Sequence, residues 1–182
     1  MKHDYCYVKN LYTPAECAAI RTAIENNIFI AASDHPADRS IKTAKVDLVK
    51  YGDIKQVIDK FHNYILNINH KMFGFDIFQQ SDLDLLNYNR YHSEDRAEYS
   101  WHKDGEKDQP FDLKLTAILD LSPEPYEGGE FSLFLDGPCE IAEFRGQGAM
   151  IIFPSWIVHK VNPVTSGTRI SLSHFVAGPL LK

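Results

Sequence analysis

The stretch "GAMIIFPSWIVHKVNPVTSGTRISL", residues 148–172, carries short runs of β-branched and aromatic residues that are divided by turn residues. Pro154 ends the first run, Pro163 follows the second, and Gly167 precedes the third. Short apolar runs bounded by Gly, Pro and Ser predict strands that are joined by tight turns. The stretch therefore favours an all-β arrangement for this part of the chain.

Similar short runs of β-branched and aromatic residues begin near residue 82 and continue almost to the end of the chain. They include "LDLLNYNRY", "LKLTAILDLS", "GEFSLFLDG" and "RISLSHFVA". Many short strands at near-regular spacing indicate a sandwich or a closed barrel, and we expect a jelly roll, the double-stranded β-helix, over about residues 81–178.

The N-terminal part is expected to be helical and to support this β domain. "TPAEC" at 13–17 offers Thr13 as a cap and Glu16 as its capping-box partner, for a helix that runs to about Asn26. A second helical pattern follows Gly52, with Asp53 as its expected cap and Gly74 as its stop.

Between the helices, residues 31–45 are expected to form a mobile lid segment that leads into a strand at about 43–49. The whole chain, residues 1–182, then forms a single mainly β domain of α+β class, with supporting helices and the lid segment over about 1–80.

The composition narrows the classes of function. The chain has 182 residues and a net charge of −6, which argues against a nucleic-acid partner bound through its phosphates. No apolar run approaches the ~20 residues of a membrane helix, so no membrane partner is expected. The cysteines, Cys6, Cys17 and Cys139, form no C-x-x-C motif and indicate reduced thiols and a cytoplasmic location.

A candidate metal site lies in "YSWHKDGEK", residues 99–107. His102 and Asp104 are two residues apart, so they share one face of a strand or of its end. His159 lies on the later strand "IVHKV". Two histidines and one carboxylate form the facial triad of non-haem Fe(II) oxygenases, although a hydrogen-bonded surface pair remains the alternative interpretation of His102 and Asp104.

Arg169 follows His159 by ten residues, at the start of the last strand. An arginine that points into a jelly roll needs an anionic partner, and its planar fork suits the far carboxylate of 2-oxoglutarate. Ser171 lies on the same face and offers a further hydrogen bond. A surface salt bridge at a strand end is the alternative role for Arg169.

Residues 86–177 resemble the Fe(II)/2-oxoglutarate-dependent dioxygenases, and within them the prolyl 4-hydroxylase-like branch that includes the PKHD-type hydroxylases. The segments that carry the resemblance are "RYHSEDRAEYSWHKD", "YEGGEFSL" and "GAMIIFPSWIVHKVNPVTSGTRISL". The resemblance implies that His102, Asp104 and His159 bind Fe(II), that Arg169 holds the 2-oxoglutarate C5 carboxylate, and that Tyr91 contacts this cosubstrate.

The implied reaction is hydroxylation of a protein or peptide, with proline as the leading target, coupled to decarboxylation of 2-oxoglutarate to succinate and CO2. O2 is the second cosubstrate, and ascorbate is a further candidate cofactor. The nucleic-acid-repair branch has a second arginine six residues after the first, where this chain has Phe175. Phe175 is expected to point inward, and His174 away from the iron.

Two other functions stay open at this point. A jelly roll also serves as a non-catalytic, cupin-like metal- or sugar-binding module, and the same oxygenase chemistry acts on small molecules. Arg169 with Ser171 distinguishes the first of these, because a pure binding module does not need a clamp for a 2-oxoglutarate carboxylate.

Overall fold

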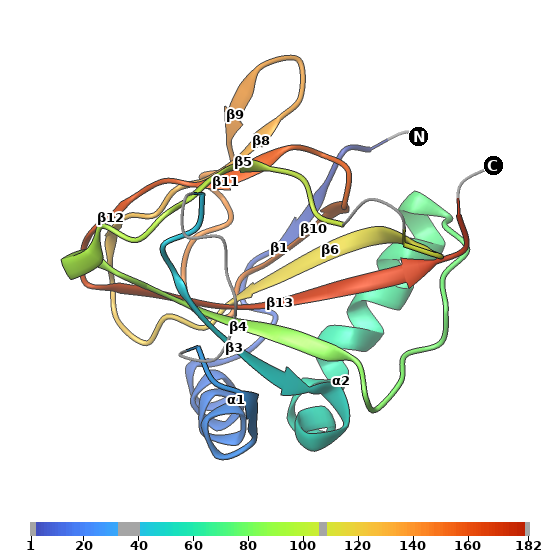
Figure 1. The fold of residues 1–182 in the computed structure, drawn as a ribbon, viewed down its shortest axis with the longest axis horizontal. Coiled ribbons are helices and arrows are strands. Elements are labelled where there is room, and N and C mark those ends of the chain that lie inside the picture. The colour runs from blue at the N-terminus through green and yellow to red at the C-terminus, as the bar shows by residue number, and fades with distance from the viewer. Residues whose placement is uncertain (1–2, 33–40, 106–108, 181–182) are drawn as a thin grey trace.

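Two antiparallel sheets face each other in the computed structural model, which describes residues 3–32, 41–105 and 109–180 (Figure 1). The larger sheet has seven strands in the order β1-β10-β6-β13-β4-β3-β2, and the smaller has four in the order β5-β11-β8-β9. A two-stranded ladder, β12-β7, completes the described strands. This arrangement is the predicted double-stranded β-helix.

The bounds of the strands follow the short runs seen in the sequence. The larger sheet consists of β1 Cys6–Val8, β2 Ile28–Ile30, β3 Lys45–Lys50, β4 Leu85–His92, β6 Asp112–Asp120, β10 Met150–Pro154 and β13 Thr168–Gly178. The smaller sheet consists of β5 Tyr99–His102, β8 Phe131–Phe134, β9 Pro138–Glu140 and β11 His159–Val161. The ladder consists of β7 Glu127–Gly128 and β12 Val164–Ser166.

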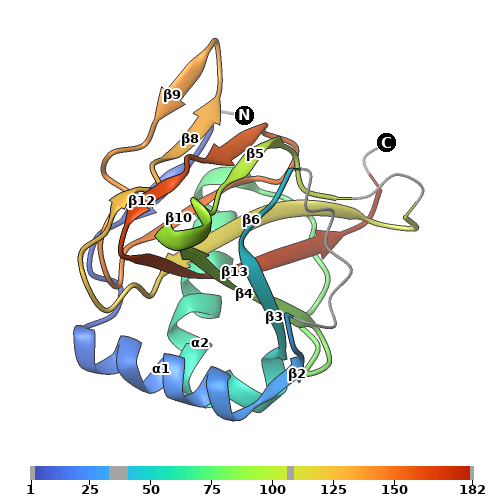
Figure 2. The same cartoon turned by 60° about the vertical axis from the view of Figure 1, so that its left-hand side comes forward.

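Two helices cover the face of the larger sheet that points away from the smaller sheet, as Figures 1 and 2 both show. The first, α1 Pro14–Asn26, begins with the predicted capping box between Thr13 and Glu16. The second, α2 Tyr51–Ile68, continues into a π-helical turn, Asn69–Phe73, that Gly74 ends in a left-handed conformation. None of the described helices is long and apolar enough to cross a membrane.

The start of α2 differs from the prediction that Asp53 caps it. The cap position is Lys50, the last residue of β3, and it makes no side-chain capping bond. The backbone N–H groups of Tyr51 and Gly52 instead donate to the carbonyl oxygens of Asp84 and Asp82, at 2.8 and 2.9 Å. Asp53 was the wrong cap because a neighbouring loop satisfies the helix end and the strand turns directly into the helix.

The N-terminal part contributes more than supporting helices. It adds β1, β2 and β3 to the larger sheet, whereas the sequence predicted only the strand at 43–49, which is β3. Of the predicted mobile segment 31–45, residues 33–40 lie outside the described residues. The polar loop that follows β4 forms a short 3-10 turn, Ser93–Asp95, before β5.

Strand β13 is the central element because one of its faces packs against the helices and the other borders a pocket between the sheets. Leu172 and Val176 pack in a cluster with the helices, while Arg169 and Ser171 line a pocket on the opposite face, between the sheets. Successive side chains of a strand point to opposite faces, so one strand separates the two environments.

His174 belongs to the helix-facing side of β13, as predicted, and is 1% exposed. Its ring stacks on His62 of α2 at a centroid distance of 5.6 Å and also lies against Tyr51 and Phe61. Burial, together with the neighbouring His62, lowers the pKa of His174 to about 3. The imidazole is therefore held neutral in an apolar layer.

This buried imidazole predicts an acid-dependent loss of stability. The folded pKa lies below the ordinary value of about 6.5, so the stability it contributes is present above that value and is lost as the pH falls. We expect the wild type to lose on the order of 2 kcal/mol more unfolding free energy than His174→Leu between pH 7.5 and pH 5. Urea unfolding at several pH values measures this difference, and parallel pH curves for the two proteins would contradict it.

Candidate metal centre and its pocket

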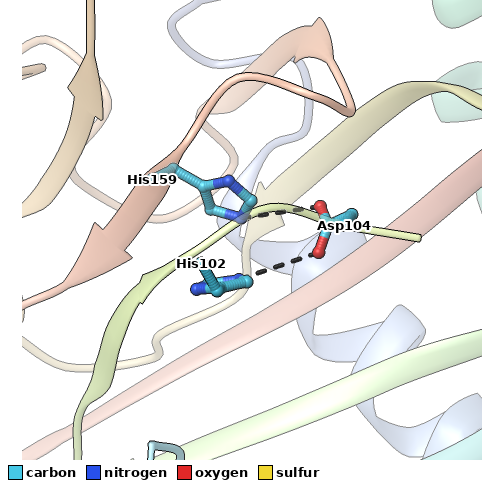
Figure 3. A group of neighbouring side chains, drawn as sticks. All are labelled: His102, Asp104 and His159. Atoms are coloured by element: carbon cyan, nitrogen blue, oxygen red, sulfur yellow. Dashed lines mark ion pairs between the residues drawn. The ribbon is translucent and has the colours of Figure 1, made fainter. Parts of the chain in front are cut away.

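Three potential metal ligands come together from the two neighbouring strands β5 and β11 (Figure 3). His102 ends β5 and pairs directly with His159, the first residue of β11, across the antiparallel ladder. Asp104 follows two residues after His102, where its backbone N–H donates to the carbonyl oxygen of Ser155 at 3.1 Å. The register of one strand pair and one short turn therefore brings the three side chains together.

The side chains are close enough to share one ion. The Nε2 atoms of His102 and His159 lie 3.7 and 3.5 Å from the two Asp104 carboxylate oxygens, and the potential ligand atoms all lie within 4.8 Å of one another. All three side chains are at most 10% exposed. In Figure 3 they converge on one point between the strands.

Each histidine is oriented by its own strand. The Nδ1 atom of His102 lies 2.8 Å from the carbonyl oxygen of Ser100, and that of His159 lies 2.9 Å from the carbonyl oxygen of Ile157. A carbonyl only accepts, so both Nδ1 atoms carry the proton and both Nε2 lone pairs face Asp104. Burial is the largest cause that lowers the pKa of each imidazole to about 4. The neutral, lone-pair-bearing form that a metal requires is thus the resting form.

Asp104 is held by a buried hydroxyl that the sequence analysis did not identify. The Thr116 hydroxyl on β6 donates to Asp104 Oδ2 at 2.6 Å and lies 3.0 Å from Ser155 Oγ. Burial raises the pKa of Asp104, and the Thr116 bond opposes that shift. A hydrogen-bond partner of this kind fixes the orientation of a metal ligand. The alternation of "LKLTAILDL" is the one sequence pattern that indicates an inward-pointing Thr116.

The predicted cosubstrate residues line the same pocket as the three ligand candidates. Arg169 is 2% exposed, and its guanidinium lies over the rings of Tyr91 and Phe144, at 5.2 and 5.9 Å from their centroids. Its Nη1 donates to Ser171 Oγ at 3.4 Å, whereas its Nη2 makes no hydrogen bond with any of the described residues. A buried guanidinium with an unused donor is one that is built to receive an acceptor.

Phe175 also lines the pocket, as strand parity predicted. The sequence did not predict the part played by the segment before β3. Lys42, from that segment, lines the pocket together with Asn89 of β4. The expected lid therefore contributes a positive charge to the site itself.

Gly129 leaves room for the buried arginine. It has φ +65°, and a Cβ there would lie 3.1 Å from Arg169 Cδ and 3.0 Å from Val164 Cγ2. The adjacent Glu130 braces a loop by accepting a hydrogen bond from Asn162 at 3.2 Å. The glycines predicted to form the turn thus have two roles: Gly129 allows the left-handed backbone conformation, and it forms part of the wall behind Arg169.

A double-stranded β-helix that presents two histidines and one carboxylate at a pocket is the framework of the non-haem Fe(II) oxygenases. The sequence profile described as the 2OG-Fe(II) oxygenase superfamily matches residues 86–177, about half of the chain, and the chain belongs to this family. Members of the superfamily use Fe(II), 2-oxoglutarate and O2.

Curated relatives are similar over part of the chain. A PKHD-type hydroxylase of Janthinobacterium sp. is 41% identical over 91 residues, which cover 46% of this chain and 39% of the relative. One from Colwellia psychrerythraea is 47% identical over 58 residues, which cover 32% of this chain and 25% of the relative. The chain thus spans less than half the length of these curated relatives.

Solved structures show the same fold over nearly the whole chain. A Pseudomonas putida prolyl-4-hydroxylase superimposes with a TM-score of 0.73 at 20% identity and covers 98% of this chain and 95% of its own. A viral collagen prolyl hydroxylase from Paramecium Bursaria Chlorella virus-1 gives 0.71 at 19% identity, with 97% of each chain covered.

Gly129 provides a test of the wall behind Arg169. Gly129→Ala puts an L side chain into a left-handed conformation and against the arginine, so we expect it to lower the unfolding free energy by about 1–3 kcal/mol. Gly137→Ala is the matched control, because a Cβ there meets nothing within 4 Å. Urea unfolding measures both variants, and equal midpoints would show that the wall is looser than described.

Proposed function

We propose that the protein is an Fe(II)- and 2-oxoglutarate-dependent hydroxylase that acts on a prolyl residue of a protein or peptide. In this proposal residues 1–182 work as one domain, His102, Asp104 and His159 hold the iron, and Arg169 holds 2-oxoglutarate with Ser171 and Tyr91. We also propose a cytoplasmic location, which rests on the three unpaired cysteine thiols.

The observation that carries the proposal is the buried Arg169. Its guanidinium stays charged at any accessible pH, and its Nη2 lacks a partner in the part of the chain that the structure describes, although the side chain is almost fully enclosed. A carboxylate at this end of the pocket would supply the missing acceptor. Because the ligand candidates line the same pocket, a dicarboxylate that also reaches the metal fits both ends.

The residues around the candidate metal site fit Fe(II). Two imidazoles and one carboxylate suit this ion, and three protein ligands leave coordination positions for other molecules. The ligands are pre-oriented by the Ser100 and Ile157 carbonyls and by Thr116, so metal binding would not require rearrangement. Phe131 and Phe153 pack against the His159 ring and keep that side of the site apolar.

The chemistry that iron, 2-oxoglutarate and O2 supply when bound is oxidative decarboxylation to succinate and CO2, with one oxygen atom inserted into a substrate C–H bond. The protein's part is to position and to neutralise. Arg169 offsets one cosubstrate charge and fixes its far end. Asp104 contributes one negative charge to the metal site, and the two neutral histidines contribute none.

A protein or peptide substrate is supported by the chain's neighbours. Curated relatives carry the name PKHD-type hydroxylase, and solved neighbours include prolyl hydroxylases. One of these, from Trichoplax adhaerens, is described in complex with a peptide fragment of the hypoxia inducible factor oxygen degradation domain. Mass spectrometry of prolyl proteins and peptides incubated with the iron-loaded protein tests the proposal, through a hydroxylation mass shift on proline.

The triad makes a first prediction for this function. His102→Ala, Asp104→Ala and His159→Ala should each weaken Mn(II) binding, a stand-in for Fe(II), by at least about 100-fold, because loss of a ligand exceeds the usual effect of losing an outer partner. Each should also abolish succinate formation. Calorimetry measures the metal affinity, with the exposed His70→Ala as control. A variant that keeps full metal affinity and activity would remove its residue from the triad.

Arg169 makes the sharper prediction. Arg169→Lys keeps the charge but loses the two-pronged fork, so the dissociation constant for 2-oxoglutarate should rise by about 10- to 150-fold, the equivalent of a charge-assisted hydrogen bond of about 1.5–3 kcal/mol. Arg169→Ala should weaken binding further, because the carboxylate would be buried without a partner.

The measurement is anaerobic titration of 2-oxoglutarate into Mn(II)-loaded protein, with the Mn(II) affinity itself as the internal control. Equal 2-oxoglutarate affinity in the wild type and Arg169→Ala would place the clamp elsewhere and would favour a cupin-like binding module. Succinate formation from 2-oxoglutarate alone separates an enzyme from such a module directly.

A further inference from the structure

A short segment before β3 closes one side of the pocket by joining the two sheets. Lys42 forms an antiparallel bridge with Tyr99 of β5, and the flanking bonds run from Thr43 N to Glu98 O at 3.1 Å and from Ser100 N to Ile41 O at 2.8 Å. Three residues later the chain enters β3 of the larger sheet. Figure 2 shows this passage, where the chain above β3 runs up beside β5.

The bridge aims the Lys42 side chain into the pocket. Its Nζ donates to Asn89 Oδ1 at 2.9 Å and lies 4.5 Å from the centroid of the Tyr99 ring. The amide of Asn89 is itself held, because its Nδ2 donates to Ser173 Oγ at 3.1 Å. The ammonium thus occupies a prepared position with a fixed acceptor and an aromatic face.

No carboxylate lies within 4 Å of this ammonium among the residues that the structure describes. Burial lowers the pKa of Lys42 to about 8, with Asp104 opposing the shift and Arg169 adding to it, so the side chain is mostly charged at pH 7. A half-buried ammonium that has no ion partner among the described residues keeps a charge that an incoming anion can satisfy.

The charges in the proposed complex show which molecule brings that anion. Fe(II) with Asp104 carries a net charge of +1, and Arg169 carries another, so the two carboxylates of 2-oxoglutarate balance them. Asp120 is a further negative charge in this region, but it does not line the pocket. Its carboxylate accepts hydrogen bonds from Tyr126 Oη at 3.1 Å and from Ser122 N at 2.8 Å. Among the described residues that line the pocket, the charge of Lys42 is therefore the one left without a counter-charge when metal and cosubstrate are in place.

We propose that Lys42 is a specificity-determining residue, which binds a carboxylate of the substrate and so selects peptides with an acidic residue close to the target proline. The proposal rests on the proposed function and names the substrate class of the same site. The exposed neighbours of Lys42, Ile41 and Thr43, place this segment at the pocket's outer edge, where an incoming peptide would meet it.

The test uses pairs of synthetic prolyl hexapeptides that differ only by Glu or Gln at one position. The pool is passed over immobilised protein loaded with Mn(II) and 2-oxoglutarate without O2, and mass spectrometry quantifies the retained peptides. At one position at least, the wild type should retain the Glu peptide about tenfold better than its Gln twin. The net charge of −6 works against any general attraction of acidic peptides.

Lys42→Gln keeps a donor for Asn89 without the charge, and it should bring the Glu-to-Gln ratio close to one. Lys42→Met should do the same, and Lys42→Arg should restore a preference for Glu. Lys160→Gln is the matched control, because that lysine lies over Trp101, whose side chain belongs to the opposite face of β5 from His102, and it should keep the wild-type ratio.

A wild-type ratio near one, or no retention of any acidic peptide, overturns the proposal, as does a ratio that Lys42→Gln leaves unchanged. Calorimetry of 2-oxoglutarate supplies a second readout, for which we expect less than a twofold change in Lys42→Gln. A tenfold weaker cosubstrate affinity would assign Lys42 to 2-oxoglutarate and also overturn it. Failure of the wild type to bind 2-oxoglutarate at all would instead reject the proposed function.

Discussion

A guanidinium enclosed between two sheets is the constraint around which the pocket is organised. Arg169 is 2% exposed and is covered by the rings of Tyr91 and Phe144, yet one of its terminal nitrogens finds no acceptor among residues 3–32, 41–105 and 109–180. An interior charge of this kind lowers stability unless a partner arrives. The enclosed charge therefore lowers the stability of the fold, and Gly129, which has no side chain, leaves the space that the Arg169 side chain occupies.

The remaining architecture isolates this charged pocket from the apolar layer behind it. Strand β13 points Arg169 and Ser171 toward the smaller sheet, and Leu172 and His174 toward the helices. The helices thus bury the back of the strand that carries the site, without contributing to its chemistry. A shift of one residue in the register of β13 would exchange these faces and would place an arginine among aliphatic side chains.

The sequence predicted those features that depend on alternation or on local signals. Strand parity placed Arg169, Ser171 and Phe175 on one face and His174 on the other, and the Thr13–Glu16 box marked the start of α1. Local patterns could not reveal partners that are distant along the chain. Three features depend on tertiary packing that no local pattern encodes: the bond between Thr116 and Asp104, the backbone acceptors at the start of α2, and the position of Lys42 in the pocket.

The bridge at residues 41–43 lies outside the segment 86–177 that the superfamily profile matches, although it borders the same pocket. Its backbone bonds, which tie it to β5, do not depend on which side chain stands at position 42. A substitution at position 42 can therefore leave this backbone bridge and the β5–β11 strand pair as they are. The backbone that frames the pocket and the side chain proposed to select the substrate are thus separable, so position 42 is a place where a single substitution can change the charge of the pocket's edge without changing its framework.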